Sequence, residues 1–354
     1  MHQPSARLGS YARVHRQLTE LAKELGLPLD SACARLEALA QSPLSGPSRT
    51  SAGRYSAINH DGVPFQWSFA IEAGTGRSQL GFITDVGHAN MTLEERIVSG
   101  QDALCRLCRE FPLAVGAFNE TLKLLMPPVT ELRQSIMAVC VASSITDPSA
   151  LPKVYVHAGA GPVTERWARF RAAISHDRPW ALGLMTRLQK HGALRPVYSA
   201  FDLQPDGLGR IKLYCSLVAP IDDAHLAEWA DAMNKDYRIR LPLLRTIVDT
   251  STFQPRWADV CLEIGTSCGS MGLKVDMNLC HLGISDCQAY SRLTKLYDIT
   301  GTPTDDLIRV GKVLLNFELH ERGPARHLLF ISIALRGTRT VLTSYFHPFG
   351  ADYG

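Results

Sequence analysis

Apolar residues along this chain follow two different spacings. Between residues 10 and 40 they recur every three or four positions, as at Leu18, Leu21 and Leu25. That spacing predicts amphipathic helices, and Gly26-Leu27-Pro28 divides the segment into two of them. Beyond residue 50 the chain instead contains short alternating runs that lie close together in pairs. Paired runs separated by turn residues predict β-hairpins.

Five such hairpins are predicted, with helical segments between them. In the first, Tyr55–Asn59 and Pro64–Glu72 flank His60-Asp61-Gly62, and a further strand is expected at 80–86. The other four are expected at 135–157, 196–218, 257–280 and 326–346. Helix pairs are expected at 92–126, 163–191, 222–249 and 285–314. The pattern therefore predicts five ββαα units with a period of roughly 60–70 residues.

The order of these elements favours one architecture. Strands that follow one another as hairpins pair in antiparallel fashion. About ten strands can close on themselves, which removes the unpaired edges of the sheet. We therefore predict a single α/β (α+β) domain over residues 1–354, in which helices surround a closed antiparallel ten-stranded β-barrel. A barrel of this size can enclose a ligand in its lumen.

Composition narrows the function without identifying it. Of the 354 residues, 45% are hydrophobic and 20% charged, which is normal for a globular protein with a large core. A net charge of +3 is too small to indicate nucleic acid as a partner, and no apolar run approaches the length of a membrane span. Nine scattered cysteines favour a reducing cytoplasm over a disulfide framework. No aspartate-rich or HExxH motif is present, so no metal or other cofactor is expected.

One row of side chains suggests chemistry. In a strand, Arg210, Lys212 and Tyr214 would share one face, while the apolar residues between them would share the other. Facing water, such a row would be an ordinary solvated strand. Facing a cavity, it would suit a multiply charged anion, because arginine grips phosphate oxygens bidentately and lysine adds a point charge. Lys153-Val154-Tyr155 repeats the pattern, which suggests that both rows face one interior.

These local sequences together resemble a known family. Asp61–Ser68, Lys153–Tyr155, Ser199–Leu203 and Arg210–Tyr214 are similar, in order and spacing, to strands of the αββα-barrel (PT-barrel) aromatic prenyltransferases. The resemblance is to the dimethylallyltryptophan synthase family, in a compact form like its bacterial members, and extends from about Tyr11 to Pro348. It implies Friedel–Crafts transfer of a dimethylallyl or longer prenyl group from an isoprenyl diphosphate to an indole or tryptophan-derived acceptor, without an obligatory metal.

The resemblance also implies roles for individual residues. Diphosphate-binding cations would be Lys153, Arg210, Lys212 and Lys274. Tyrosines that shield the allylic cation would be Tyr155, Tyr214 and Tyr345. Gln66 and Lys153 would be the catalytic residues, and Arg326 is a further possible contributor.

Two departures from the family pattern affect the expected acceptor and donor sites. Gln66 replaces a glutamate that orients and activates an indole N–H, and an amide is not a useful base. A phenolic or other fused-ring acceptor is therefore the alternative. The family's arginine near Leu80-Gly81-Phe82 is also missing. A non-catalytic barrel that binds an apolar ligand is a further alternative, although buried cations would serve no purpose in one.

Overall fold

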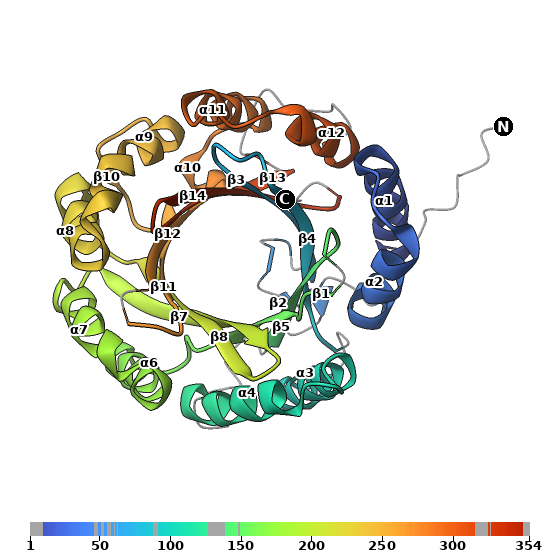
Figure 1. The fold of residues 1–354 in the computed structure, drawn as a ribbon, viewed down its shortest axis with the longest axis horizontal. Coiled ribbons are helices and arrows are strands. Elements are labelled where there is room, and N and C mark those ends of the chain that lie inside the picture. The colour runs from blue at the N-terminus through green and yellow to red at the C-terminus, as the bar shows by residue number, and fades with distance from the viewer. Residues whose placement is uncertain are drawn as a thin grey trace.

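Ten strands form a closed barrel at the centre of the molecule (Figure 1). The computed structural model describes residues 10–45, 49–50, 53–54, 58–59, 61, 63–87, 91–126, 139–147, 149–268, 270–315, 325 and 327–349. The barrel strands, in chain order, are β3 (Phe65–Glu72), β4 (Ser78–Asp85), β5 (Val139–Ser144), β6 (Lys153–His157), β7 (Leu194–Gln204), β8 (Gly207–Leu217), β11 (Ala258–Ile264), β12 (Met271–Asn278), β13 (Leu328–Arg336) and β14 (Arg339–Phe346). Every neighbouring pair is antiparallel, and β8 pairs with β11 to complete the circle. The predicted closed antiparallel barrel is confirmed.

Helices form a ring outside the barrel (Figure 1). They are α1 (Ser10–Leu25), α2 (Leu29–Leu44), α3 (Leu93–Leu107), α4 (Pro112–Leu125), α6 (Val163–Asp177), α7 (Leu182–Lys190), α8 (Asp223–Met233), α9 (Pro242–Val248), α10 (Leu279–Leu282), α11 (Asp286–Ile299) and α12 (Asp305–Leu314). The shorter elements are the 3₁₀ helices η1 (Pro179–Ala181) and η2 (Lys235–Arg240), and the two-residue strands β1 (Arg49–Thr50), β2 (Gly53–Arg54), β9 (Ile221–Asp222) and β10 (Thr252–Phe253).

The repeating unit differs in phase from the prediction. The final hairpin, β13–β14, is not followed by a helix pair in the described residues, whereas α1 and α2 precede the first hairpin. The units are therefore ααββ, and the N-terminal helices fill the gap in the ring between α12 and α3 (Figure 1). Hydrogen bonds connect α1 to the barrel. Gln17 of α1 donates to the carbonyl of Pro348 at 2.7 Å and accepts from the indole N–H of Trp67 at 3.0 Å.

The first hairpin is also corrected. β3 pairs with β4 across residues 73–77, where Gly74 and Gly76 have φ of 80° and 69°. Left-handed backbone of this kind favours glycine in tight turns. Ile58 and Asn59 are not in a strand, and the Asn59 amide instead donates to the carbonyls of Val63 and Phe65. The prediction that the first hairpin turns at Asp61-Gly62 was therefore wrong. The other positions of the predicted strand Tyr55–Asn59, residues 55–57, lie outside the described residues.

The two faces of each barrel strand have different environments. Outward residues such as Ile211, Leu213 and Phe65 are buried in the main core between the barrel and the helices. Burying large apolar side chains contributes about 1.5–3 kcal/mol each, so this layer provides most of the stabilisation of the ring. Inward residues line a lumen with polar, charged and tyrosine side chains. Within the described residues, no helix combines the length and apolarity that crossing a bilayer requires.

Candidate active site

The lumen contains two adjoining chambers. The first, which we call the tyrosine chamber, has a volume of about 250 Å³, and the second, the cation chamber, about 290 Å³. Ile83, Tyr155 and Tyr345 line both of them. Successive inward positions of one strand pass from one chamber to the next, since Gln66 lies in the tyrosine chamber and Ser68 in the cation chamber. Barrel geometry therefore places two chemically different environments in contact.

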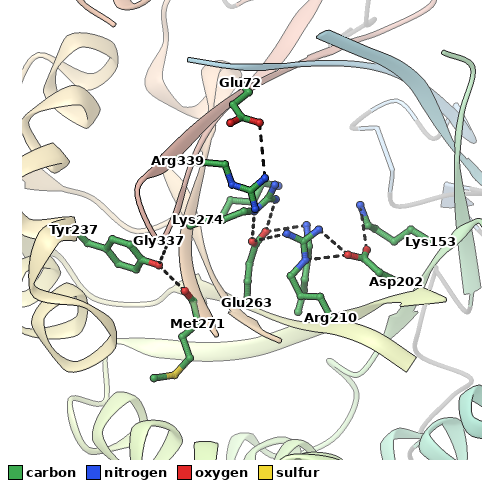
Figure 2. A network of polar contacts seen from close by, with 12 residues as sticks. Glu72, Lys153, Asp202, Arg210, Tyr237, Glu263, Met271, Lys274, Gly337 and Arg339 are labelled. Atoms are coloured by element: carbon green, nitrogen blue, oxygen red, sulfur yellow. Dashed lines mark hydrogen bonds and ion pairs between the residues drawn. The ribbon is translucent and has the colours of Figure 1, made fainter. Parts of the chain in front are cut away.

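The cation chamber is built around two carboxylates. Glu263, on β11, accepts from Lys212 at 2.9 Å, from Arg210 at 2.9 Å and from Arg336 at 2.5 Å. Asp202, on β7, accepts from Arg210 at 2.6 Å and lies 3.4 Å from the Lys153 ammonium. Figure 2 shows Arg210 between these two carboxylates, with Lys153 on the far side of Asp202. Four cations from three strands, β6, β8 and β13, thus converge in this part of the barrel.

The two carboxylates are held in their ionised form. Burial opposes ionisation of Glu263, yet Lys212, Arg336 and Arg210 hold its pKa well below 4.5. Burial likewise opposes ionisation of Asp202, while Lys153 and Arg210 hold the pKa of that carboxyl well below its usual value. The cations are therefore partly neutralised by protein groups. Removing Glu263 would leave the buried charge of Lys212 without its partner.

A fifth cation lies where the two chambers meet. The ammonium of Lys274 contacts Asp276 at 2.7 Å and donates to the Tyr345 hydroxyl at 3.0 Å. Although burial opposes the charge, Asp276 raises the pKa of Lys274 well above 10.5. The same ammonium lies 5.3 Å from the ring centres of Tyr214 and Tyr345. Together with Lys153, Arg210, Lys212 and Arg336, it gives five basic side chains against the carboxylates Asp202, Glu263 and Asp276, a formal excess of two positive charges when all five are protonated. Burial lowers the pKa of both Lys153 and Lys212.

The tyrosine chamber presents aromatic faces. Tyr198 and Tyr214 stack with their ring centres 4.4 Å apart, and Tyr155 lies 6.1 Å from Tyr214. Burial raises the pKa of Tyr155, Tyr198 and Tyr214 well above 10, so all three are neutral phenols near neutral pH. A neutral aromatic ring presents a negative face that attracts cations. This wall is suited to a cationic or aromatic guest.

All eight residues predicted for the site line these chambers. Gln66 and Tyr214 are in the tyrosine chamber, Lys153, Arg210, Lys212 and Lys274 are in the cation chamber, and Tyr155 and Tyr345 line both. Their chemical roles stay predictions. Arg326 lies outside the described residues.

The segment near which the family has an arginine, Leu80-Gly81-Phe82, includes one position that could not hold a side chain with this backbone. Gly81 lines the cation chamber, and a Cβ added there would lie 2.6 Å from the carbonyl oxygen of Ser143. A side chain at this position would therefore require the backbone to shift. Arg336, which enters the same chamber from β13, supplies a guanidinium from another direction.

Sequence reasoning assigned no role to several residues of the site. Glu263, Arg336, Asp259 and Tyr198 were not singled out, and Asp202 was noted only as part of a motif. A signal for the acidic residues existed, because Asp259, Cys261 and Glu263 alternate along β11 and so face the lumen together. Arg336 was harder to identify, because it is the last residue of β13, next to the turn of the final hairpin. Among the described residues, no group of three His, Cys, Asp or Glu side chains is arranged to hold a metal ion.

Neither a protein-family model nor a curated protein sequence matches this chain. Solved structures match it over nearly its whole length. The 6-dimethylallyltryptophan synthase from Micromonospora olivasterospora, solved in complex with DMASPP and Trp, is 18% identical with a TM-score of 0.80, covering 96% of this chain and 98% of that one. The 5-dimethylallyltryptophan synthase from Streptomyces coelicolor is 18% identical with a TM-score of 0.75, covering 97% and 99%.

A fungal structure extends the comparison beyond bacteria. AnaPT from Neosartorya fischeri is 17% identical with a TM-score of 0.75, covering 98% of this chain and 95% of its own. At such low sequence identity, these matches show that the backbone follows the same path, from the first helix pair to the last hairpin. This chain therefore shares the PT-barrel fold of the dimethylallyltryptophan synthases and related aromatic prenyltransferases.

Proposed function

We propose that this protein is an aromatic prenyltransferase, which ionises an isoprenyl diphosphate and transfers the prenyl group to an electron-rich arene. Dimethylallyl diphosphate is the expected donor. The observation that carries the proposal is that the cation chamber and the tyrosine chamber adjoin and share Tyr155 and Tyr345. Cleavage of the donor C–O bond creates a diphosphate anion and an allylic cation side by side, and each of these chambers suits one of them.

The diphosphate would occupy the cation chamber. Lys153, Arg210, Lys212, Lys274 and Arg336 line it, a formal excess of two positive charges over the local carboxylates. Fixed cations stabilise charge that develops on the leaving oxygen, without reorganising at the moment of reaction. Removing one such electrostatic group from an active site typically slows a reaction by about 10²–10³-fold. This chain's own side chains supply the charge that the reaction needs.

The allylic cation would form beside the tyrosine faces. Tyr155, Tyr214 and Tyr345 all line the tyrosine chamber, and the Lys274 ammonium already lies 5.3 Å from the ring centres of Tyr214 and Tyr345. The position is thus one where the protein accommodates a positive charge against aromatic faces. Cation–π attraction is worth up to about 2 kcal/mol for a desolvated pair. Enclosure by the barrel limits the access of water, which would otherwise quench the cation.

The acceptor would lie in the tyrosine chamber, within reach of Gln66. Its π electrons form the new C–C bond with the allylic carbon, and the resulting arenium ion loses a ring proton to restore aromaticity. Lys153 is the proposed proton carrier: it gives its proton to the released diphosphate and then takes the ring proton. Burial lowers the pKa of Lys153, Asp202 opposes that shift, and Arg210 adds to it. The lowered pKa favours loss of the ammonium proton.

Indole and tryptophan-derived arenes are the first acceptor candidates, as in the named synthases. Phenolic or other fused-ring arenes are the alternative, because the neutral Gln66 amide can both donate to and accept from a hydroxyl. A carrier of an apolar ligand is disfavoured, since burying several cations without use is costly.

The test is transfer of a labelled prenyl group. The protein is incubated with labelled dimethylallyl diphosphate and, separately, tryptophan, tryptamine, indole and a naphthol, and labelled products are separated by chromatography. We expect at least one prenylated arene, with transfer lowered by about 10²–10³-fold in Lys212→Ala. Lys295→Ala, on the exposed surface of α11, is the matched control and should retain full activity. Absence of any prenylated product with longer donors as well would refute the proposal.

A further inference from the structure

The tyrosine chamber carries negative charge that the proposed transfer reaction does not use. Asp259 on β11 and Asp276 on β12 both line it, and they are direct partners in the register of the two strands. Like charges placed directly opposite one another on a sheet are destabilising. Asp276 is balanced by Lys274 at 2.7 Å. A second acid beside this pair therefore needs its own explanation.

Asp259 has neutral hydrogen-bonding partners. Its carboxylate accepts from the Ser216 hydroxyl at 2.5 Å, and the Tyr198 phenol is its other side-chain donor. No described lysine, arginine or histidine lies within ion-pair distance of it. Burial raises the pKa of Asp259 to about 6; Ser216 and Tyr198 oppose the shift, Asp276 adds to it, and Lys274 is the nearby cation. The group still ionises near neutral pH, and a bound cation would favour the ionised form.

The part of the chamber wall that the structure describes offers no positive charge to a ligand. None of the described residues that line it is a lysine, arginine or histidine. The ammonium of Lys274 is already held by Asp276 and Tyr345. Among these described residues, a ligand carboxylate would meet two acids and no counter-ion, whereas a ligand ammonium would meet Asp259 and the faces of several tyrosines.

A second, independent observation points to a ligand in the same place. Gln66 is 4% exposed, lines the chamber, and its amide nitrogen has no hydrogen-bond partner. An unpaired buried donor costs free energy, and a bound molecule that accepts from it recovers that cost. The chamber thus combines one unused donor with one acid that lacks a cationic partner.

We infer that the aromatic acceptor carries a protonated amine, which Asp259 receives, and no free carboxylate. This inference rests on the proposed prenyl transfer for the identity of the ligand as an acceptor. It distinguishes this chain from a synthase that takes tryptophan itself, because the described lining offers the carboxylate of a free amino acid neutral groups such as the Gln66 amide but no cation. An indole ethylamine, or an arene in which the carboxyl is absent or bound in an amide, fits the wall.

The test compares two ligands of opposite charge on the same ring. Binding of tryptamine and of indole-3-propionate to the wild-type protein is measured by calorimetry at pH 7.5, and prenyl transfer to both is measured with dimethylallyl diphosphate. We expect tryptamine to bind at least about tenfold more tightly and to be the better acceptor. In Asp259→Asn the affinity ratio should fall to within about threefold of one, while Asp298→Asn on the outer surface of α11 should leave it unchanged.

The outcomes separate the two proposals. Equal or tighter binding of the propionate by the wild-type protein overturns the inference, even if Asp259→Asn cannot be obtained folded. An unchanged ratio in a folded Asp259→Asn variant also overturns it. Transfer to neither ligand, nor to any other arene, refutes the proposed prenyl transfer instead, and with it the statement that the amine belongs to an acceptor. In that case the binding ratio still decides the charge preference of the chamber.

Discussion

Replacing Glu263 by glutamine would test how the cation chamber is held together. The substitution keeps the size of the side chain and removes the charge that Lys212, Arg210 and Arg336 share at 2.5–2.9 Å. Glu263 is 1% exposed, so water cannot replace the lost carboxylate. Three cations would then face one another across a neutral amide. We expect a less stable protein with a greater affinity for anions.

The size of the effect follows from burial. Removing one partner of a buried ion pair costs about 3–5 kcal/mol, and because three cations share Glu263 we expect about 4–5 kcal/mol. The entropy of unfolding is about 2.1 cal/mol/K per residue, hence about 0.7 kcal/mol/K for this chain, and the Tm should fall by about 5–7 °C. The pKa of Glu263 in the folded protein lies below its ordinary value of 4.5. The ionised Glu263 therefore contributes its full stabilisation of the fold above pH 4.5, and this contribution is lost as the pH falls through the pKa of the folded state. The difference in Tm between wild type and Glu263→Gln should therefore be constant between about pH 6 and 8.

The assay is thermal unfolding with and without inorganic diphosphate. At about 100 times its Kd, a ligand stabilises by about 2.7 kcal/mol, which is about 4 °C here. In Glu263→Gln the diphosphate shift should be larger at the same concentration, because the added anion replaces the missing carboxylate. Glu24→Gln is the matched control, since its exposed pair with Lys312, at 3.0 Å, should contribute less than about 1 kcal/mol. Equal Tm losses in the two variants, or equal diphosphate shifts in wild type and Glu263→Gln, would refute the reasoning.

Four further expectations concern donor, acceptor, metal and pH. Arg210→Ala should raise the Kd of a non-reactive donor analogue about ten- to a hundredfold with an unchanged circular dichroism spectrum, and an unchanged Kd would remove Arg210 from the diphosphate site. Gln66→Glu should shift the ratio of transfer rates toward indole and away from a naphthol, and a constant ratio would place Gln66 outside the acceptor site. Transfer should persist in EDTA, because lysine and arginine supply the charge; complete loss that magnesium restores would contradict this. Tryptamine affinity should rise as pH increases through about 6, where Asp259 ionises, and a flat titration between about pH 5 and 7 would argue against that pairing.

The periodicity of the strands predicted the barrel and the faces of its residues. Arg210, Lys212 and Tyr214 face the lumen because side chains alternate, and no tertiary information was needed for that. Turn chemistry was less reliable. The Asp-Gly at 61–62 matches a hairpin turn, but the chain turns at 73–77, where two glycines adopt left-handed backbone.

The charge partners were beyond the reach of sequence reasoning. Glu263 meets Arg210 and Arg336 from positions 53 and 73 residues away, so their proximity depends on which strands become neighbours after closure. The positive row on β8 and the alternating acids on β11 were both visible in the sequence, but which carboxylate pairs with which cation became evident only in three dimensions.

Because the first barrel strand pairs with the last, the barrel cannot close until nearly the whole chain has been synthesised on the ribosome. β3 pairs with β14, so one edge of β3 has no partner until a strand about 270 residues further along the chain has been made. At about 5–20 residues per second this interval lasts about 14–55 s. The outer face of β3 gains some cover earlier, because Gln17 of α1 contacts Trp67, but its backbone donors and acceptors remain open. The same pairing that leaves the finished barrel without an edge gives the nascent chain a long-lived one, and a stalled or truncated product would expose it to other chains.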